Sequence, residues 1–232
     1  MRNDITDLLF DLDDTLWDCA GNSVISLHKL YDNHKLSNHF HSFASFNNIY
    51  QHINDELWAA LPDSCMTVAD VRIERFVRTL GAVGINSTEL GERLNDEYMK
   101  LMVKCPGTMP HAAEVLEELS QRYRVSIVTN GIADVQRGKM AASGLEKYAY
   151  DVFVSDEIGA MKPKKEYFDR VLKRLGICKS ACIVIGDNAV TDIKGATDFG
   201  LSAVWYNWKG EPQNISCGVE IIDDLRKLLD IL

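Results

Sequence analysis

Two aspartates near the start of the chain, Asp11 and Asp13, are separated by one residue and follow a short apolar run. The run, Leu8-Leu9-Phe10, is typical of a short buried strand. Because ligands bind at the carboxyl ends of the strands in an open α/β sheet, we expect both carboxylates at a ligand site. Two acids placed in this way can hold one metal ion and divide the roles of nucleophile and proton donor. An acidic turn or helix cap is the other interpretation of this segment taken alone.

Residues that suit a phosphate group come after the next two apolar runs. Thr129-Asn130-Gly131 follows the run 125–128, and a hydroxyl with free backbone N–H groups at a helix start can bind phosphate. Lys162 comes after the run 151–154 and precedes a proline, which holds its backbone extended and can aim its ammonium at an anion. An ordinary helix cap and a solvated lysine are the structural alternatives.

A second pair of aspartates follows the apolar run 181–185. Asp187 comes directly after Gly186, and Asp192 lies about one helical turn further on. If the strands that end before Asp11 and Asp187 are neighbours, the two carboxylates lie side by side. Oxygen ligands of this kind are those that Mg²⁺ prefers, so the sequence predicts a magnesium site.

The charges of these residues can be counted. With Asp11, Asp13, Asp187 and Asp192 all ionised, Lys162 and a divalent metal leave one negative charge, which would repel a phosphate dianion. A proton on Asp13 makes the site neutral. The count therefore favours a bound metal and Asp13 as the protonated acid.

Strands and helices alternate in the second half of the chain. This pattern predicts an α/β fold with a doubly wound, mostly parallel sheet that is covered on both faces. With the first strand included, the predicted strands are 8–10, 125–128, 151–154, 181–185 and 202–205. The predicted helices are 112–121, 135–143, 165–175, 191–199 and 223–232.

An all-helical segment interrupts this pattern. Residues 20–104 show helical periodicity without a strand signal, which indicates four or five helices. Thr67 is expected to cap one of them, with Asp70 in its first turn, and Pro106-Gly107 marks the end of the segment. The predicted division is 1–17 with 106–232 for the sheet domain and 18–105 for the inserted helical domain.

Composition limits the classes of function. The 232 residues suffice for one sizeable core with an inserted subdomain. The net charge of −9 argues against a nucleic-acid polymer or an anionic membrane as partner, but not against a small phosphate ester. No apolar stretch is long enough for a bilayer, the N-terminus does not resemble a signal peptide, and the six cysteines include no Cys-x-x-Cys pair. These features favour a cytoplasmic protein, and nothing in them indicates an oligomeric state.

The order of the motifs resembles a known family. Asp11-Leu12-Asp13-Asp14-Thr15, Thr129-Asn130, Lys162 and Gly186-Asp187 through Asp192 are similar to the four motifs of the haloacid dehalogenase superfamily. The resemblance spans nearly the whole chain and implies a Rossmann-like core with a helical cap domain. Lys162-Pro163 followed by Tyr167-Phe168 also resembles the phosphatase branch of that superfamily.

The resemblance implies a role for each motif. Asp11 is the nucleophile that forms a phosphoaspartate, and Asp13 protonates the leaving oxygen and then activates water. Lys162 offsets charge on Asp11 and on the transferring phosphoryl group, which it helps to bind. The other implied roles are the Mg²⁺ ligands Asp11, Asp13 (through its backbone carbonyl) and Asp187, the phosphate-binding Thr129 and Asn130, and the supporting Thr15 and Asp192.

The same comparison narrows the reaction. Related dehalogenases lack the second acid that Asp13 supplies, and ATP-driven pumps need membrane helices. Within the helical segment, Glu56-Leu57-Trp58 and the run from Thr67 to Phe76 resemble the cap of house-cleaning pyrimidine 5′-nucleotidases. The preferred prediction is therefore a magnesium-dependent phosphomonoesterase that acts on nucleoside 5′-monophosphates. The alternatives are a sugar-phosphate phosphatase or phosphomutase and, in a different class, a non-catalytic module that binds a phosphorylated ligand.

Candidate substrate contacts in the helical segment have structural alternatives. Trp58 could stack on a base or pack between helices, and Arg72 and Arg75 could reach a substrate group or belong to a solvated helix face. Two other groups of residues are interpreted first as structural. His34, His39 and His41 lack an acidic or thiol partner at a suitable spacing and are expected in a surface loop, with a metal site as the alternative. The run Trp205-Tyr206-Asn207-Trp208 is expected to pack at a strand end, with contact to substrate or to a second subunit as the alternative.

Overall fold

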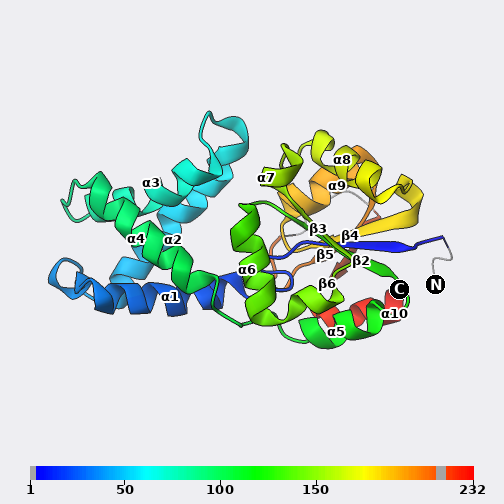
Figure 1. The fold of residues 1–232 in the computed structure, drawn as a ribbon, viewed down its shortest axis with the longest axis horizontal. Helices are drawn as coiled ribbons and strands as arrows, with labels where there is room; N and C mark the ends of the chain where they lie inside the picture. The colour runs from blue at the N-terminus through cyan, green and yellow to red at the C-terminus, as the bar shows by residue number, and fades with distance from the viewer. Residues whose placement is uncertain (1–3, 213–217) are drawn as a thin grey trace. The chain divides into compact units, whose positions relative to one another are not determined.

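The computed structural model describes residues 4–212 and 218–232. Its central feature is a six-stranded sheet with the strand order β3-β2-β1-β4-β5-β6 (Figure 1). The strands are β1 (Asp7–Phe10), β2 (Arg124–Thr129), β3 (Asp151–Val154), β4 (Cys182–Gly186), β5 (Ser202–Tyr206) and β6 (Glu220–Ile222). Each neighbouring pair is parallel, so the predicted α/β fold with a doubly wound sheet is confirmed.

The register of β1 fixes where its aspartates lie. Phe10 is paired with Ile127 of β2 on one side and with Ile185 of β4 on the other. The strand order reverses direction at β1, because β2 and β3 extend to one side and β4 to β6 to the other. Such a switch point is where open parallel sheets bind their ligands, and Asp11 is the first residue beyond it.

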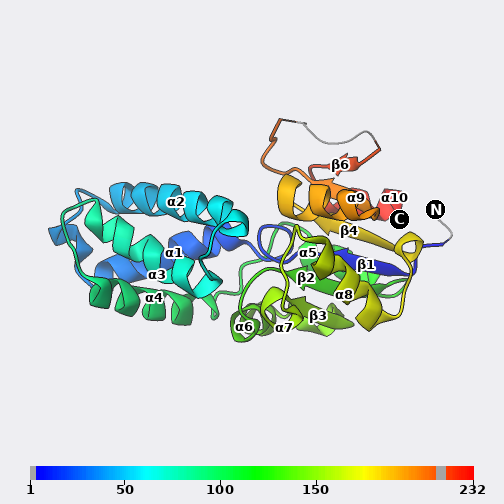
Figure 2. The ribbon, with the colours of Figure 1, turned by 90° about the horizontal axis from the view of Figure 1, so that it is seen from above.

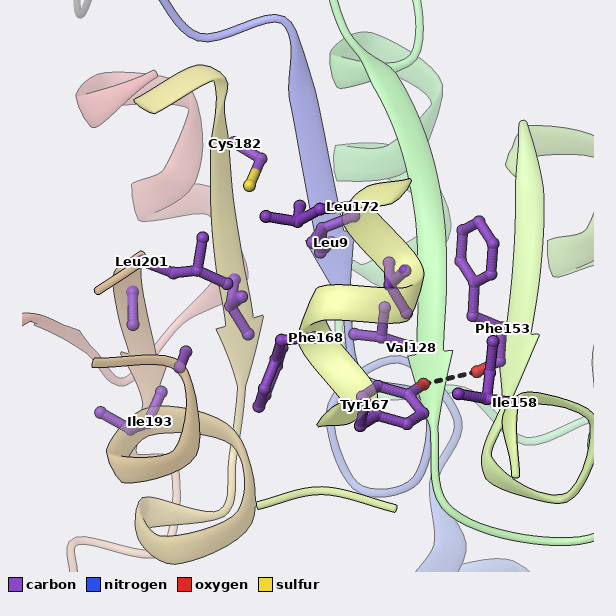
Figure 3. Close-up of a cluster of buried hydrophobic side chains, with 14 of the residues drawn as sticks. Leu9, Val128, Phe153, Ile158, Tyr167, Phe168, Leu172, Cys182, Ile193 and Leu201 are labelled. Atoms are coloured by element: carbon purple, nitrogen blue, oxygen red, sulfur yellow. Dashed lines mark hydrogen bonds between the residues drawn. The ribbon is translucent and has the colours of Figure 1, made fainter. Parts of the chain in front are cut away.

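Helices cover both faces of the sheet, with α8 and α9 on one face and α5 and α10 on the other (Figure 1). The helices of this unit are α5 (Ala112–Leu119), α6 (Ala133–Ser143), α7 (Ser155–Ile158), α8 (Lys165–Leu175), α9 (Gly195–Phe199) and α10 (Leu228–Ile231). Figure 3 shows Tyr167 and Phe168 of α8 packed over Leu9 and Val128 of the sheet. The Tyr167 hydroxyl donates to the carbonyl of Phe153 at 2.6 Å, which fixes the start of α8 and the segment before it.

The chain divides into two compact units. One comprises Met1–Cys19 with Pro106–Leu232, and the other comprises Ala20–Cys105. The helices of the second unit are α1 (Cys19–Asn33), α2 (Phe43–Ala60), α3 (Val68–Gly81) and α4 (Thr88–Met102). Within this helical unit, α3 packs against both α2 and α4 (Figure 2). Its role as a cap over the active site remains a prediction.

Local capping explains where α3 begins. The Thr67 hydroxyl accepts the N–H of Asp70 at 3.1 Å, and the Asp70 carboxylate accepts the N–H of Thr67 at 2.7 Å. This reciprocal pair satisfies two of the N–H groups that a helix start leaves without partners, so the predicted cap is confirmed. No helix in the described ranges is both long and apolar enough to cross a membrane.

Several element predictions were wrong in detail. Strand β6 was not predicted because it has only three residues, fewer than a pattern of apolar residues needs to be visible. The helix predicted at 223–232 is a 3₁₀ turn, Leu225–Lys227, followed by α10. The helix predicted at 191–199 begins as a π-helical turn, Ala189–Lys194, where the Asn188 side chain accepts two backbone N–H groups before α9 follows.

Candidate active site

Asp11 lies at the centre of the polar residues beyond the strand ends. Its backbone N–H donates to the carbonyl of Ile185 at 2.8 Å, which continues the β1–β4 pairing by one residue. One carboxylate oxygen, Oδ1, lies 2.6 Å from Nζ of Lys162. Burial raises the pKa of Asp11 well above its ordinary value. The Lys162 ammonium opposes that rise in pKa, and the carboxylates of Asp192 and Asp187 add to it.

Lys162 is buried, and all three of its ammonium protons have protein acceptors. Nζ donates to Asp11 Oδ1 at 2.6 Å, to Asp192 Oδ1 at 2.6 Å and to the carbonyl of Val128 at 2.8 Å. Burial by itself would lower the pKa of Lys162, but the carboxylates of Asp11 and Asp192 outweigh it and raise that pKa, which keeps the ammonium charged. In this arrangement Lys162 acts on the site through its charge and has no proton left for a further acceptor.

Asn130 holds the backbone of Lys162 in place. Its amide nitrogen donates to the carbonyl of Lys162 at 3.0 Å, and its amide oxygen accepts the Lys162 N–H at 2.9 Å. The peptide bond that follows, Lys162-Pro163, is cis. The Asn130 side chain is therefore a support for Lys162, and its backbone N–H is the group that remains predicted to bind phosphate.

Asp187 and Asp192 are brought beside Asp11, as the sequence analysis required. Thr15 Oγ1 accepts the N–H of Asp187 at 2.9 Å and lies 3.3 Å from its Oδ1. Asp192 is buried and accepts the N–H of Asn188 at 3.1 Å through Oδ2. A side chain at Gly186 would collide with the Asp192 carboxylate, so glycine is required at this strand end.

The three carboxylates form a set that could hold a metal ion. One oxygen each from Asp11, Asp187 and Asp192 lies within 4.8 Å of the others. An all-oxygen set at the end of a sheet suits Mg²⁺, and the residues present therefore fit the predicted metal. Burial and the neighbouring Asp192 raise the pKa of Asp187 to about 7, although Lys209 lowers it.

Asp13 faces a different set of partners. Lys139 Nζ contacts both carboxylate oxygens of Asp13, at 2.8 and 2.9 Å, and Gln136 Nε2 donates to Oδ2 at 3.0 Å. The same Gln136 nitrogen donates to Thr129 Oγ1 at 2.6 Å. Neither Gln136 nor Lys139 was predicted from the sequence. Their spacing of three places them on one face of a helix, but it does not indicate that this face turns toward Asp13.

Two further residues support the loop after β1: Trp208, predicted to pack at a strand end, and Lys209, which was not predicted from the sequence. The indole N–H of Trp208 donates to the carbonyl of Asp14 at 3.0 Å, and Asp14 has a left-handed backbone with φ of 61°. Lys209 Nζ lies 3.4 Å from Asp14 Oδ2 and 3.3 Å from Asp187 Oδ2. Trp205, predicted to pack at a strand end, also donates its indole N–H to the Asp187 carbonyl at 2.8 Å.

These contacts correct the charge count made from the sequence. Among the contacts that the structure describes, the linked groups are five carboxylates and three lysines: Asp11, Asp13, Asp14, Asp187 and Asp192 with Lys139, Lys162 and Lys209. With all of them ionised, two negative charges remain, and a divalent cation makes the site neutral without a proton on Asp13. The earlier count omitted Lys139, Lys209 and Asp14, so its argument for a protonated Asp13 does not hold.

A sequence model of the haloacid dehalogenase-like hydrolases matches residues 8–200 of the chain. The chain belongs to this family. It is 32% identical over 203 residues to the putative HAD-hydrolase YfnB of Bacillus subtilis, covering 86% of this chain and 83% of YfnB. It is 28% identical over 202 residues to the pyrimidine 5′-nucleotidase PynA of Streptococcus pneumoniae, covering 86% and 83% of the two chains. The pyrimidine 5′-nucleotidase YjjG of Escherichia coli is 26% identical over 227 residues, 96% of each chain.

A solved structure agrees with the sequence comparison. The crystal structure of YfnB bound to magnesium matches this haloacid dehalogenase-like hydrolase with a TM-score of 0.89 and 30% identity, covering 98% of both chains. The match extends over both the sheet unit and the helical unit. The hydrolase family and the fold that the motifs predicted are therefore confirmed.

In this haloacid dehalogenase-like hydrolase, the three candidate substrate residues of the helical unit are largely enclosed. Arg72 and Arg75 are buried, and Trp58 is half-buried in α2. The Arg75 guanidinium lies 4.8 Å from the ring centroid of Tyr98 and donates to Asn54 Oδ1 at 3.1 Å. The alternative of a solvated helix face was wrong for both arginines. The structure supports a packing role for Arg75, and it leaves substrate contact by Trp58 and Arg72 a prediction.

One of the three histidines of this segment, His34, differs from the prediction because it has an acidic partner. His34 lies 2.7 Å from Glu97 Oε2, and Asn33 donates to Glu97 Oε1 at 2.7 Å. The hydrogen bond from Asn33 is the main reason that the pKa of Glu97 is lowered. The acidic partner that the sequence analysis did not find comes from α4, far away in the chain. This contact joins the end of α1 to α4 within the helical unit.

Proposed function

We propose that this protein is a magnesium-dependent phosphomonoesterase that forms a phosphoaspartate on Asp11. The observation that carries the proposal is that residues of two distant segments, Lys162 and the pair Asp187 and Asp192, lie close to the Asp11 carboxylate. Lys162 lies 2.6 Å from Asp11, and oxygens of Asp187 and Asp192 lie within 4.8 Å of an Asp11 oxygen. Family membership supports this assignment. The segments that meet at Asp11 resemble three of the four family motifs, and the second-motif segment is joined to Lys162 through the Val128 carbonyl and the Asn130 side chain.

The proposed reaction has two steps. A carboxylate oxygen of Asp11 attacks the phosphorus, and the bond from phosphorus to the leaving oxygen breaks. Asp13, which takes up a proton as the phosphate dianion adds two negative charges to the site, gives that proton to the leaving oxygen. Water then attacks the phosphorus of the phosphoaspartate, Asp13 takes a proton from this water, and the bond from phosphorus to Asp11 breaks. The products are an alcohol and inorganic phosphate, and both aspartates return to their starting forms.

Other residues of the chain hold the phosphoryl group and balance charge. The Thr129 hydroxyl and the Asn130 N–H are the proposed donors to phosphoryl oxygens, and Lys162 offsets the negative charge on Asp11. The Asp11 and Asp187 carboxylates with the Asp13 carbonyl would hold the metal, and Thr15 and Asp192 would orient them. When bound, Mg²⁺ supplies positive charge to the phosphoryl oxygens.

Nucleoside 5′-monophosphates are the proposed substrate class. Two relatives that align with most of this chain, PynA and YjjG, are named pyrimidine 5′-nucleotidases. We propose that the helical insert, 18–105, selects the substrate, as an inserted domain that excludes water from a phosphoryl-transfer site would do. Trp58 and Arg72 are its remaining candidate contacts, since Arg75 packs against aromatic rings of the helical unit, and the indole of the half-buried Trp58 could stack on a base.

A phosphate-release panel tests both levels of the proposal. Purified protein with Mg²⁺ is assayed against nucleoside monophosphates, sugar phosphates and phosphoglycolate, together with Asp11→Asn and, as a matched control, Asp198→Asn, an exposed aspartate paired with Lys194. We expect phosphate release from nucleotides by the wild type and by Asp198→Asn, and none by a folded Asp11→Asn. Release from sugar phosphates alone would remove the nucleotide assignment, and conversion of one sugar phosphate to its isomer would identify a mutase. Binding of phosphate esters with no release from any of them would replace the enzyme by a binding module.

A further inference from the structure

Two side chains of α6, Gln136 and Lys139, enclose the acid of the first motif. We propose that they are positioning residues for phosphoryl transfer, which hold the Asp13 carboxylate and the Thr129 hydroxyl in their working orientations. The inference rests on the proposed function, because it gives Asp13 the proton-transfer role. Gln136 and Lys139 lie outside the four motifs, and Gln136 links the Asp13 carboxylate physically to the Thr129 hydroxyl.

Lys139 differs from a surface lysine because its ammonium is buried and bonded to a carboxylate. Its side chain is only 7% exposed, and its Nζ bonds to both oxygens of Asp13, at 2.8 and 2.9 Å. The ammonium also lies 4.7 Å from the ring centroid of the buried Trp17. Removing an ammonium from water costs free energy unless an acceptor is fixed opposite it, and here the acceptor is Asp13. Arg137 on the same helix contrasts with it, since it pairs with Glu157 at 48% exposure.

Gln136 joins Asp13 to Thr129. Its Nε2 donates to Asp13 Oδ2 at 3.0 Å and to Thr129 Oγ1 at 2.6 Å, so both amide protons are used. A carboxylate can only accept hydrogen bonds, and the amide nitrogen must therefore face Asp13. The remaining amide proton then reaches Thr129, whose oxygen accepts it. The Thr129 hydroxyl in turn donates to the carbonyl of Asn130 over a long 3.4 Å, a weak bond that a phosphoryl oxygen could replace.

The chain makes room for this amide. A side chain at Gly131 would approach Gln136 Cδ to 3.0 Å, and the Gly131 backbone has φ of 153°, in the region that favours glycine. The Gly131 N–H is held by Ser155 Oγ at 2.9 Å. The turn after β2 therefore leaves space for the Gln136 side chain, and it also carries the proposed phosphate donors Thr129 and Asn130.

The arrangement predicts different effects for different leaving groups. Asp13 matters most when the leaving oxygen must receive a proton, as in an alkyl ester, and least when the leaving anion is stable, as in 4-nitrophenyl phosphate. Loss of Lys139 frees the Asp13 carboxylate to rotate and should therefore slow alkyl esters selectively. Loss of the Gln136 amide frees Thr129 as well, and should weaken phosphate binding for every ester.

The test compares four variants in the presence of Mg²⁺: Lys139→Met, Lys139→Arg, Gln136→Leu and the control Arg137→Met. The readouts are kcat and KM for 4-nitrophenyl phosphate and for the alkyl monoester most active in the panel. For Lys139→Met we expect kcat on the alkyl ester to fall about 10- to 100-fold, with a change of less than about threefold on the aryl ester. Lys139→Arg should restore most of the loss, Gln136→Leu should raise KM for both esters, and Arg137→Met should match the wild type.

Distinct outcomes would overturn each level of the account. Equal losses on the two esters, or no loss, for a folded Lys139→Met would end the positioning role while leaving the phosphatase intact. Circular dichroism and thermal melting show whether Lys139→Met folds. If it does not, the two esters are compared with Lys139→Gln instead, and the same outcomes support or overturn the positioning role. A wild type that releases no phosphate, or an Asp11→Asn variant that does, removes the proposed function and this inference with it.

Discussion

The ammonium of Lys162 lies 2.6 Å from the carboxylate of Asp11, although the two residues are 151 positions apart in the chain. Neither residue lies in a regular helix or strand, and each is held in place by residues at the ends of strands. The Asp11 N–H extends the pairing of β1 with β4. The Asn130 side chain, which directly follows β2, makes two hydrogen bonds to the Lys162 backbone. The sheet therefore sets the distance between the proposed nucleophile and the cation that lies beside it.

Replacing Lys162 by methionine tests this balance. The variant leaves the buried carboxylates of Asp11 and Asp192 without their shared cation, and we expect the free energy of unfolding to fall by about 3 kcal/mol or more, with loss of activity. Chemical denaturation measures the change. Lys173→Met, which removes an exposed pair with Asp169, is the matched control and should change stability by less than about 0.5 kcal/mol. A Lys162→Met variant as stable as that control would mean that the buried carboxylates do not depend on the ammonium.

Magnesium binding should be visible as stabilisation. A ligand present at about 100 times its dissociation constant adds roughly 2.7 kcal/mol to the free energy of unfolding. We expect Mg²⁺ to raise the melting temperature of the wild type, and Asp187→Asn to lose most of this shift because one carboxylate ligand is gone. An identical shift in the variant would place the ion elsewhere.

The raised pKa of Asp187 predicts a pH dependence in the metal-free protein. Its pKa is about 7 when folded, well above the ordinary value of 3.8, so the folded state holds a proton that the unfolded chain has released. This contribution to stability is present in full below about pH 4 and is lost as the pH rises to 7, roughly 1–4 kcal/mol in all. Denaturation in the presence of a chelator should show the decline from Asp187, and Asp187→Asn should flatten it. A decline of the same size in the variant would assign it to other groups.

Gly186 offers a test of the strand end that carries Asp187. A methyl group at this position collides with the Asp192 carboxylate, so Gly186→Ala should displace Asp192 from Lys162 and reduce both stability and activity. We expect a loss of about 2 kcal/mol or more in the free energy of unfolding. Gly81→Ala, at the end of α3 with no atom within 4 Å of the added methyl, should be neutral or slightly stabilising. Equal behaviour of the two alanine variants would contradict the proposed collision.

Substitution of Arg75 distinguishes a packing role for this residue from a role in substrate binding. Because its guanidinium lies among the rings of Tyr50, Phe76 and Tyr98, Arg75→Met should lower the free energy of unfolding by about 1–3 kcal/mol. The folded fraction should keep the KM of the wild type. A raised KM at unchanged stability would instead support the substrate role first suggested by the sequence.

The four motifs could be predicted because strand ends are local features of the chain. Asp11, Thr129 and Asp187 each follow an apolar run directly, and a parallel sheet brings such ends to one edge whatever lies between them. Arg75 was also within reach, since the buried Val71, Phe76 and Leu80 of α3 define a helix face to which it belongs. The prediction that Arg75 is solvated relied on its charge and not on its position in the helix.

Lys139, Gln136 and Lys209 were beyond the same reasoning. Which face of α6 turns toward Asp13 depends on how that helix packs, and its pattern of apolar residues does not distinguish the faces. Lys209 lies in a loop after β5, where no periodicity applies, and it reaches Asp14 and Asp187 only through the fold. The charge of an active site is set by such long-range contacts, and for this reason the count made from the motifs alone was incomplete.

The most direct measurement is detection of phosphate bound to Asp11. Wild-type protein is mixed with its best substrate and Mg²⁺, quenched in acid during turnover, and digested for peptide mass spectrometry. The account predicts a phosphoryl group on the peptide that contains Asp11, present during turnover and absent once substrate is exhausted. Turnover with no phosphorylated protein at any time, together with full activity of Asp11→Asn, would contradict it.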